Sequence, residues 1–450
     1  MNFNKTIFAL HISFLPIIIF CFLTLLPLLP IFSFDYHNHQ RIWQIALLTF
    51  VGMLFSTQLL TRKKTTFYLD SKIIYLIAVF LILGILSSLL GNETQFSLLY
   101  TTHFLLLFTL LLYVNQRQSK QSSLLFIYCL VAAHISLLLI CLLNIIFSVT
   151  EGVDISVYIV YSGFINIRHF NQVQVFILPL LLLLVKIPNA RKVIIFMIGL
   201  NIYLMFLGKA RGTCLVWFTI LFFIYLTNKS YKKEVRLAFI ISVFVLAIYI
   251  ILEFFYQSSG IKIKGTTSGR FDMWVDIFSQ LKLSHLLIGT GPGIYGFSFP
   301  GHGPLSHPHN SILEILEEWG ILAMAIIISL VFSTAHNAYK HLKSHNKDSI
   351  TAVVFYSWLS GGVYSLVSGV LVMPVPQTLF FILWGLLLAR TNSRLSLTSL
   401  KNHGLKLVLI VFVISFIIYY FYSAFYFYNL INPDDGYTHG PRFWSVGKRE

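Results

Sequence analysis

Charged residues are scarce in this 450-residue chain, in which Asp, Glu, Lys and Arg together make up 11% of the sequence. A soluble domain carries about 25% charged residues, because its surface must be solvated by water. Hydrophobic residues instead make up 57%, and the mean hydropathy is +0.80. The composition therefore excludes a large soluble enzyme and indicates a protein whose outer surface contacts lipid.

Acidic residues are the rarer charged class, with 16 Asp and Glu against 32 Lys and Arg and a formal net charge of +16. In a soluble protein such an excess would suggest nucleic acid as the partner. Here the basic residues collect in short loops between apolar runs, as they do on the cytoplasmic side of membrane proteins. We therefore expect a lipid bilayer, and no nucleic acid, as the partner.

Cysteine is also rare. The four cysteines lie within or beside apolar runs, and no CxxC pair occurs. Free cysteines in such surroundings behave as small hydrophobic residues. There is no case for a disulfide framework or a cysteine metal site.

Long apolar runs recur from one end of the chain to the other. A helix of about 20 apolar residues spans a bilayer, and such a run is too long for a buried strand. We predict an all-α polytopic membrane protein with about 12–13 transmembrane helices. The predicted spans lie near residues 7–33, 42–60, 73–91, 98–114, 123–148, 173–187, 193–208, 213–227, 237–256, 311–333, 350–371, 378–392 and 406–428.

The loops between these spans alternate in charge. One set carries 21 of the 32 basic residues, and the positive-inside rule assigns it to the cytoplasm together with the N-terminus. The first span lacks a small-residue cleavage site, so we expect a retained helix rather than a signal peptide. We divide the chain into a transmembrane bundle over 1–256, an external loop over 257–310, further transmembrane helices over 311–428 and a short external tail over 429–450.

A few arginines fall on the external side, where the same rule predicts few. Those close to the predicted spans are Arg41, Arg168, Arg270 and Arg211, which follows Lys209 in a short turn. Each could extend its side chain to the lipid headgroups. Several arginines without neighbouring carboxylates also suggest an anionic ligand, because a guanidinium binds phosphate oxygens in a bidentate way that lysine cannot copy. A diphosphate is the natural candidate.

The external loop contains a predicted amphipathic helix that begins at Arg270. Apolar side chains recur at helical spacing, and polar side chains lie on another face. Such a helix lies on the outer leaflet of the membrane or packs against the bundle. The apolar positions are Phe271, Trp274, Phe278 and Leu281.

A glycine-rich segment, 289–296, and three histidines follow this helix. The GxGxG run is a weak nucleotide signal without a strand–helix unit, so we expect a tight external turn. His302, His307 and His309 could suggest a metal, but no nearby acid completes a convincing ligand set. Ser311 with Glu314 fits a capping box at the start of the next helix.

The capping box does not account for His309 and Asn310. A histidine at the end of a membrane helix can act as a general base near neutral pH. It could take a proton from an acceptor hydroxyl whose oxygen attacks a sugar carbon, while arginines stabilise the departing diphosphate. Such a site needs no metal.

The segment 289–323 resembles the signature of the O-antigen ligase and polymerase superfamily (Wzy/WaaL-like), which includes bacterial protein O-oligosaccharyltransferases. Its ligases carry His-Asn/Ser/Gln, nine variable residues and then Gly-x-x-Gly/Thr/Val. Here His309 and Asn310 precede nine residues and then Gly320, and Ala323 departs from the last position. The Arg270 segment and the turn 209–212 match the family's usual order, and the match covers roughly residues 160–335.

The resemblance implies a GT-C-like glycosyltransferase of the bacterial inner membrane, with a periplasmic active site and no cofactor or metal. Its donor would be a glycan on undecaprenyl diphosphate. His309 resembles the family's essential histidine, and Arg211 and Arg270 resemble the arginines that bind the diphosphate, with Arg168 a further candidate from its position. The expected supporting residues are Asn310, His307 and Lys209.

The acceptor differs among members of the superfamily. Ligases use lipid A–core, O-oligosaccharyltransferases use Ser or Thr of pilins or other exported proteins, and polymerases use another lipid-linked glycan. A short tail with no large soluble domain after the last span favours lipid A–core over an exported protein.

A transporter or flippase of a lipid-linked glycan is the competing functional class. It should carry charged groups at mid-membrane and broken helices in paired halves. The predicted spans are nearly free of mid-span charges, no halves repeat, and the polar candidates gather at one face. This pattern favours interfacial chemistry over transport. A structural partner without catalysis would leave the external arginines and the histidine motif unexplained.

Overall fold

The structure is a computed structural model of the chain. It describes residues 2–26, 36–61, 64–91, 93–153, 155, 157–161, 163–164, 167–256, 270–295, 307–345, 347–392, 395–398, 403–429 and 443–444. His302 and most of the predicted external tail lie outside the described residues.

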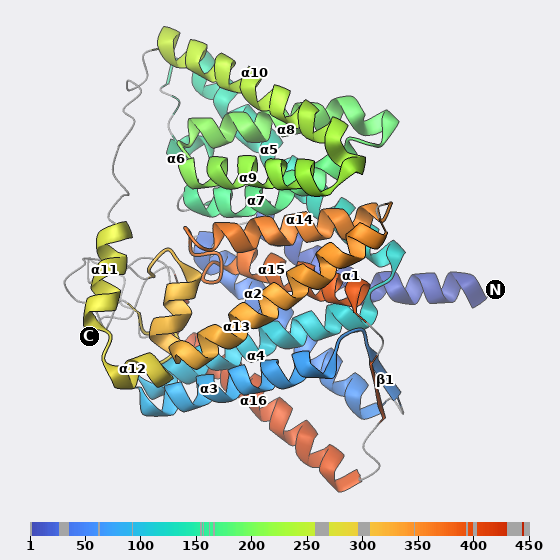
Figure 1. The fold of residues 1–450 in the computed structure, drawn as a ribbon, viewed down its shortest axis with the longest axis vertical. Coiled ribbons are helices and arrows are strands. Elements are labelled where there is room, and N and C mark those ends of the chain that lie inside the picture. Colours follow the sequence, from blue (N-terminus) through green and yellow to red (C-terminus); the bar gives the residue numbers. More distant parts are fainter. Residues whose placement is uncertain are drawn as a thin grey trace. The chain divides into compact units, whose positions relative to one another are not determined.

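Every predicted span coincides with a helix (Figure 1). The prediction of an all-α polytopic membrane protein is confirmed, and the described residues add one two-stranded antiparallel ribbon of β1 (Lys64–Phe67) and β2 (Leu395–Thr398). Several boundaries differ from the predicted ones: some helices extend into polar residues beyond their apolar runs, whereas α1, α7 and α14 end before the predicted spans do.

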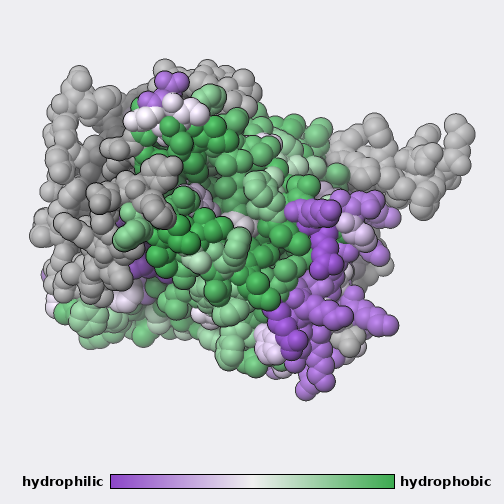
Figure 2. Space-filling view, turned by 90° about the horizontal axis from the view of Figure 1, so that it is seen from above, coloured by the Kyte–Doolittle hydropathy of each residue, from purple (hydrophilic) through white to green (hydrophobic). Residues whose placement is uncertain are grey.

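Seven helices of the described part are long and apolar enough to cross a membrane, and three shorter apolar helices accompany them. Large apolar side chains remain exposed on them, for example Phe254 at 77% and Phe332 at 70%. Water would disfavour such a surface, whereas lipid solvates it. Figure 2 shows hydrophobic side chains over much of the visible face and hydrophilic ones gathered toward one edge. The number of crossings beyond these seven stays a prediction.

The chain divides into two compact units, each assembled from separate stretches of sequence. Unit 1 contains residues 1–40, 120–267 and 339–364, and unit 2 contains residues 41–119, 268–338 and 365–450.

Unit 1 is a bundle whose helices run alongside one another (Figure 1). α14 packs against α7, α1 against α5, and α10 against α8. Buried amides join α5, α7 and α8: His134 Nε2 lies 2.9 Å from Asn201 Oδ1, and the Gln174 amide donates to the Asn201 carbonyl at 3.0 Å. In lipid such internal bonds satisfy polar groups that water cannot reach. The elements are α1 (Asn2–Leu25), α5 (Lys120–Thr150), α6 (Val157–Val160), α7 (Ile167–Leu184), η1 (Pro188–Ala190), α8 (Arg191–Leu207), α9 (Arg211–Thr227), η2 (Lys229–Tyr231), α10 (Lys232–Tyr256) and α14 (Ser349–Tyr364).

Unit 2 is built around α4, which contacts α3, α15 and α16. The apolar segment of α4 is 78% buried, against 22–50% for the other six candidate spans. Trp319 stacks on Phe80 with ring centroids 4.5 Å apart, and Trp384 Nε1 donates to Thr334 Oγ1 at 3.0 Å. Its elements are the greater part of α2 (Tyr36–Thr61), α3 (Ser71–Leu90), α4 (Thr94–Arg117), α11 (Arg270–Gln280), α12 (Leu283–Ile288), most of α13 (Ser311–Ser344), α15 (Pro374–Thr391), α16 (His403–Asn429) and the ribbon.

Segments at the two ends of α13 pair with other segments of unit 2. At one end, the Ser311 N–H donates to the Ser365 carbonyl at 2.8 Å, although we expected residue 365 to lie within a span. Loops expected inside meet at the other end, where β1 pairs with β2 and Asn337 donates to Asn392 at 3.3 Å. The alternation of loops and the side of the bilayer to which each loop belongs stay predictions.

Arg41 is buried, which corrects its interpretation as a guanidinium offered to an external ligand. It is 1% exposed, and it donates to the carbonyls of Val372 at 2.6 Å and Phe443 at 2.7 Å and to Gln44 Oε1 at 2.5 Å. Its charge also lies over the Phe443 ring, 4.8 Å from the centroid. Charge-assisted bonds of this kind are strong. Arg41 therefore ties the loop 365–373 and Phe443 to α2.

Candidate functional site

The histidine motif folds into a tight turn directly before α13. His309 has a φ of +53°, and among the described residues other than glycine only Lys209, at +51°, shares this left-handed backbone. The His309 N–H donates to His307 Nδ1 at 3.2 Å, and the two rings meet edge to face with centroids 4.2 Å apart. Strained backbone costs about 1–3 kcal/mol per residue and clusters at functional sites. Both strained residues fall in segments that the sequence predicted to be functional.

Asn310 caps α13. Its side-chain oxygen accepts the backbone N–H groups of Ile312 at 3.0 Å and Leu313 at 3.2 Å. The predicted capping box of Ser311 and Glu314 is therefore wrong, because α13 begins at Ser311 and the cap is the residue before it. Asn310 has a structural task next to the catalytic candidate.

His307 is the buried partner of His309, with 5% of its surface exposed. Its ring lies on the backbone of Gly369, where a Cβ would stand 2.5 Å from His307 Cε1 and 2.9 Å from each ring nitrogen. Because His307 Nδ1 accepts a backbone N–H, this nitrogen carries no proton. The ring thus acts as a fixed acceptor that holds the His309 backbone.

The loop 365–373 supports this arrangement. We expected a span to continue to residue 371, but α14 ends at Tyr364. The next residue, Ser365, accepts the N–H of Ser311, and Pro374 opens α15. Pro374 is suited to the first turn of a helix because it has no N–H to leave unsatisfied. The loop consequently provides both the Gly369 surface and a contact with the start of α13.

Arg270 is the first residue of the predicted amphipathic helix, which the structure confirms as α11. Arg270 is half-buried. One turn later, Trp274 Nε1 donates to the Pro308 carbonyl at 2.8 Å. This bond connects α11 to the histidine turn, so Arg270 and His309 belong to one locally connected part of unit 2.

The face that α11 buries differs from the predicted one. Met273 and Ile277 are each 1% exposed and pack with Tyr295, whereas Phe271 and Phe278 are 60% and 58% exposed. The helix therefore has a second apolar face, because Met273 and Ile277 were not counted in the predicted periodicity. Exposed aromatic residues on a short helix suit contact with the membrane interface.

The glycine-rich segment wraps around a buried carboxylate of α13. Glu318 is 2% exposed, and its oxygens accept the N–H groups of Gly293 at 2.8 Å and Tyr295 at 3.2 Å. Backbone N–H groups that converge on an anion stabilise it strongly. The run is thus a turn, as predicted, and its ligand is a side chain of the chain itself. Sequence reasoning missed Glu318, although a carboxylate within an apolar run signals function or pairing.

Gly320 breaks α13 near this point. Its φ is +84° and its ψ is 171°, so the helix stops at Trp319 and restarts with a new direction. The Leu287 carbonyl occupies the place that a Cβ at position 320 would need. Only glycine fits such a position. The spacing between His309 and Gly320 therefore fixes the length of the first part of α13.

The remaining predicted residues lie together in unit 1. Lys209 turns the chain between α8 and α9 with its left-handed backbone, and Arg211 is the first residue of α9. Ile167, which opens α7 just before Arg168, packs into the space beside Gly208. The side chains of the three basic residues are exposed.

Tyr161 supports the turn between α8 and α9. Its hydroxyl donates to the Leu204 carbonyl in the last turn of α8, and its side chain is 1% exposed. Burial raises the pKa of Tyr161, so its hydroxyl keeps its proton and remains a donor.

The three predicted arginines share one feature. Arg168, Arg211 and Arg270 each lie in the first turn of a helix, α7, α9 and α11. The helix macrodipole disfavours a cation there and favours an anion. A phosphate bound at such a position would gain from both the guanidinium and the backbone N–H groups.

The structure therefore brings the predicted residues together as two groups, one in each unit. The histidine group contains His307, His309, Asn310 and Arg270, and the basic turn contains Arg168, Lys209 and Arg211.

Residues 194–328 match a family model described as O-Antigen ligase. The matched range contains the basic turn from Lys209, α11 and the histidine motif through Gly320, and it leaves Arg168 outside. No curated protein and no solved structure matches the chain.

Proposed function

We propose that this protein is a metal-independent glycosyltransferase of the bacterial inner membrane, because residues 194–328 match the O-antigen ligase family model. It moves a glycan from undecaprenyl diphosphate to an acceptor hydroxyl at the periplasmic face. The observation that carries the proposal is the backbone geometry of His309. This residue lies within the matched range, its φ is in the left-handed region, and its N–H donates to His307 Nδ1.

His309 acts as the general base in this proposal. Its imidazole takes the proton of the acceptor hydroxyl, and the acceptor oxygen forms a bond to the anomeric carbon of the donor glycan. The bond between that carbon and the diphosphate oxygen breaks, and undecaprenyl diphosphate leaves with the electron pair. A strained, supported backbone favours this task because it fixes the direction of the imidazole before the acceptor arrives.

Arg211 and Arg270 bind the donor diphosphate, and Arg168 assists. The charge on the leaving diphosphate grows in the transition state, so preorganised cations lower the barrier. Their positions in the first turns of α9, α11 and α7 add the favourable end of each helix dipole. Lys209 contributes through its turn, which sets where α9 begins.

Lipid A–core is the acceptor that we propose, in keeping with the description of the matched family. The cytoplasmic N-terminus and the periplasmic site follow from the alternation of basic loops.

Complementation of a bacterium that lacks its own O-antigen ligase tests the proposal. Lipopolysaccharide and exported pilin are both probed for glycan, with the membrane level of the protein measured in parallel. We expect glycan on lipopolysaccharide that disappears with His309→Ala. Glycan on pilin would instead assign a protein O-oligosaccharyltransferase. Transfer to neither acceptor by a well-expressed protein supplied with matched donor and acceptor would reject both and favour a polymerase or a transporter. Inhibition by EDTA would contradict metal independence.

A further inference from the structure

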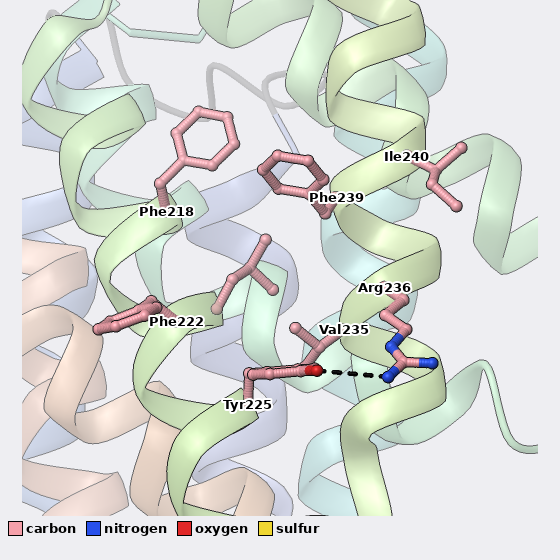
Figure 3. A pocket seen from close by; sticks show the side chains of 8 residues that line it. Phe218, Phe222, Tyr225, Val235, Arg236, Phe239 and Ile240 are labelled. Carbon is pink, nitrogen blue, oxygen red and sulfur yellow. Dashed lines mark hydrogen bonds between the residues drawn. The ribbon is translucent and has the colours of Figure 1, made fainter.

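A groove runs between α9 and α10 of unit 1, near the end of α9 opposite to Arg211. Its volume is about 420 Å³, which lies within the range of about 300–1,000 Å³ of ligand pockets. α9 supplies Phe218, Phe222 and Tyr225, whose spacing places them on one face of the helix, and α10 supplies Arg236 and Phe239 among others. Figure 3 shows these side chains along the two helices.

Most of the groove is apolar and open to lipid. Phe222 is 65% exposed and Phe239 is 52% exposed, and the rings of Phe218 and Phe239 meet edge to face with centroids 6.1 Å apart. The span that contains α10 is 22% buried, the lowest value among the seven candidate spans. A hydrocarbon chain in this groove would contact aromatic walls on both sides, where the protein makes few contacts with itself.

One end of the groove is cationic. Arg236 donates to the Tyr225 hydroxyl at 3.3 Å (Figure 3), and the Lys232 ammonium lies 4.8 Å from the centroid of the Tyr225 ring. The surrounding segment 229–236 holds four basic residues and one acid, Glu234. Tyr225 thus holds two cations at the place where the apolar groove meets the end of the helices.

We propose that this groove binds an anionic phospholipid of the bilayer, with the phosphate at Arg236 and Lys232 and one acyl chain along Phe218, Phe222 and Phe239. The charge of the rim selects the anion, because basic pockets between membrane helices attract anionic headgroups. The apolar walls select a lipid over a free phosphate. None of these residues belongs to the site of the proposed transfer reaction. We therefore expect the bound lipid to stabilise the packing of α9 against α10 and to take no part in the transfer.

Native mass spectrometry of the full chain in detergent tests this directly. Phosphatidylglycerol and phosphatidylethanolamine with identical acyl chains are added in equal amounts, and the bound populations are compared. We expect the wild type to retain more phosphatidylglycerol than phosphatidylethanolamine. In Arg236→Ala this preference should fall roughly fivefold, because that is about the factor by which one basic residue near the membrane surface strengthens the binding of an anionic lipid. Arg191→Ala removes an exposed arginine outside the groove and should leave the preference unchanged. Arg236→Gln serves if the alanine variant melts early.

A second pair of variants separates the groove from the charge. Ile240→Trp places a large side chain at the edge of the groove, which Ile240 lines and where it is 63% exposed, whereas Ile251→Trp adds the same bulk at an exposed position of α10 away from the groove. We expect Ile240→Trp to lower phosphatidylglycerol retention and Ile251→Trp to leave it intact. Equal retention of both lipids by the wild type, or unchanged retention in both Arg236→Ala and Ile240→Trp, would overturn the proposal.

Discussion

Arg41 and Arg211 look alike in the sequence and differ in the structure. Both are arginines beside an apolar run on the side where few basic residues are expected. Arg41 is 1% exposed and surrounded by carbonyl and amide oxygens, whereas Arg211 is exposed at the first residue of a helix. An arginine on the side of a membrane protein where few basic residues are expected therefore indicates that an acceptor for its hydrogen bonds binds there. That acceptor is the protein itself at Arg41, and we propose that it is the donor diphosphate at Arg211.

Among the arginine variants, the largest expected effect on activity is that of Arg211→Ala. Arg211→Ala should slow transfer by about 10²–10³-fold, because a preorganised group that stabilises developing charge is lost. Arg211→Lys should rescue poorly, since an ammonium cannot bind two phosphate oxygens as a fork. Transfer from the lipid-linked donor is measured beside the melting temperature in detergent, which should stay near that of the wild type. Full activity of the lysine variant would reduce Arg211 to a simple positive charge.

Arg41 should give the opposite result. Arg41→Ala leaves the Val372 and Phe443 carbonyls without their donor, and we expect a loss of stability of about 3 kcal/mol. Arg41→Lys should recover little of it, because one ammonium cannot reach acceptors in several directions. Thermal unfolding in detergent reads out both variants. An Arg41→Ala protein with unchanged melting temperature and abolished transfer would instead assign to Arg41 the role in donor binding that we propose for Arg211.

The contact between Gly369 and the His307 ring can be tested by substitution. Gly369→Ala should displace His307 and lower transfer by about tenfold, because misplaced catalytic groups lose rate steeply with small shifts. The matched pair is His307→Asn, whose side-chain oxygen can accept the His309 N–H, and His307→Ala, which cannot. Transfer rates and melting temperatures are compared for these variants. Equal rates for the asparagine and alanine variants would show that the bond to His309 does not support catalysis.

The smallest effect is expected at the exposed face of α11. Phe271→Ser with Phe278→Ser should leave the melting temperature in detergent nearly unchanged and weaken transfer in liposomes a few-fold, because these side chains contact lipid rather than protein. Met273→Ala on the buried face should destabilise the protein by about 2–5 kcal/mol. A large loss of stability in the Phe271→Ser, Phe278→Ser variant and none in Met273→Ala would contradict this prediction, because α11 would then pack against the bundle through its aromatic side.

The helices were predictable because each apolar run is long and carries its own signal. The start of α11 and the turn at the glycine-rich segment were also predictable from periodicity and glycine spacing. The end of α14 at Tyr364 was not, since residues 365–371 continue the apolar run and their contacts with Ser311 and His307 become visible only in the folded chain.

The candidate site was predictable at His309 and Arg270 and less so around them. Asn310 looked functional, yet its side chain caps α13, and Ser311 was mistaken for the cap because Ser311 and Glu314 have the spacing of a capping box. Glu318 and Gly369 were missed because their partners, the loop after α12 and the ring of His307, are distant in sequence. Such partners become visible only when the chain is folded.

The role of His309 can be tested in nanodiscs with the purified wild-type protein, His309→Ala and Arg211→Ala. Each protein is given an undecaprenyl-diphosphate glycan and lipid A–core. Donor binding and product formation are measured separately. We expect His309→Ala to bind the donor like the wild type and to form no product, and Arg211→Ala to bind the donor weakly. Product formation by His309→Ala at the wild-type rate would contradict the role of His309 as the general base.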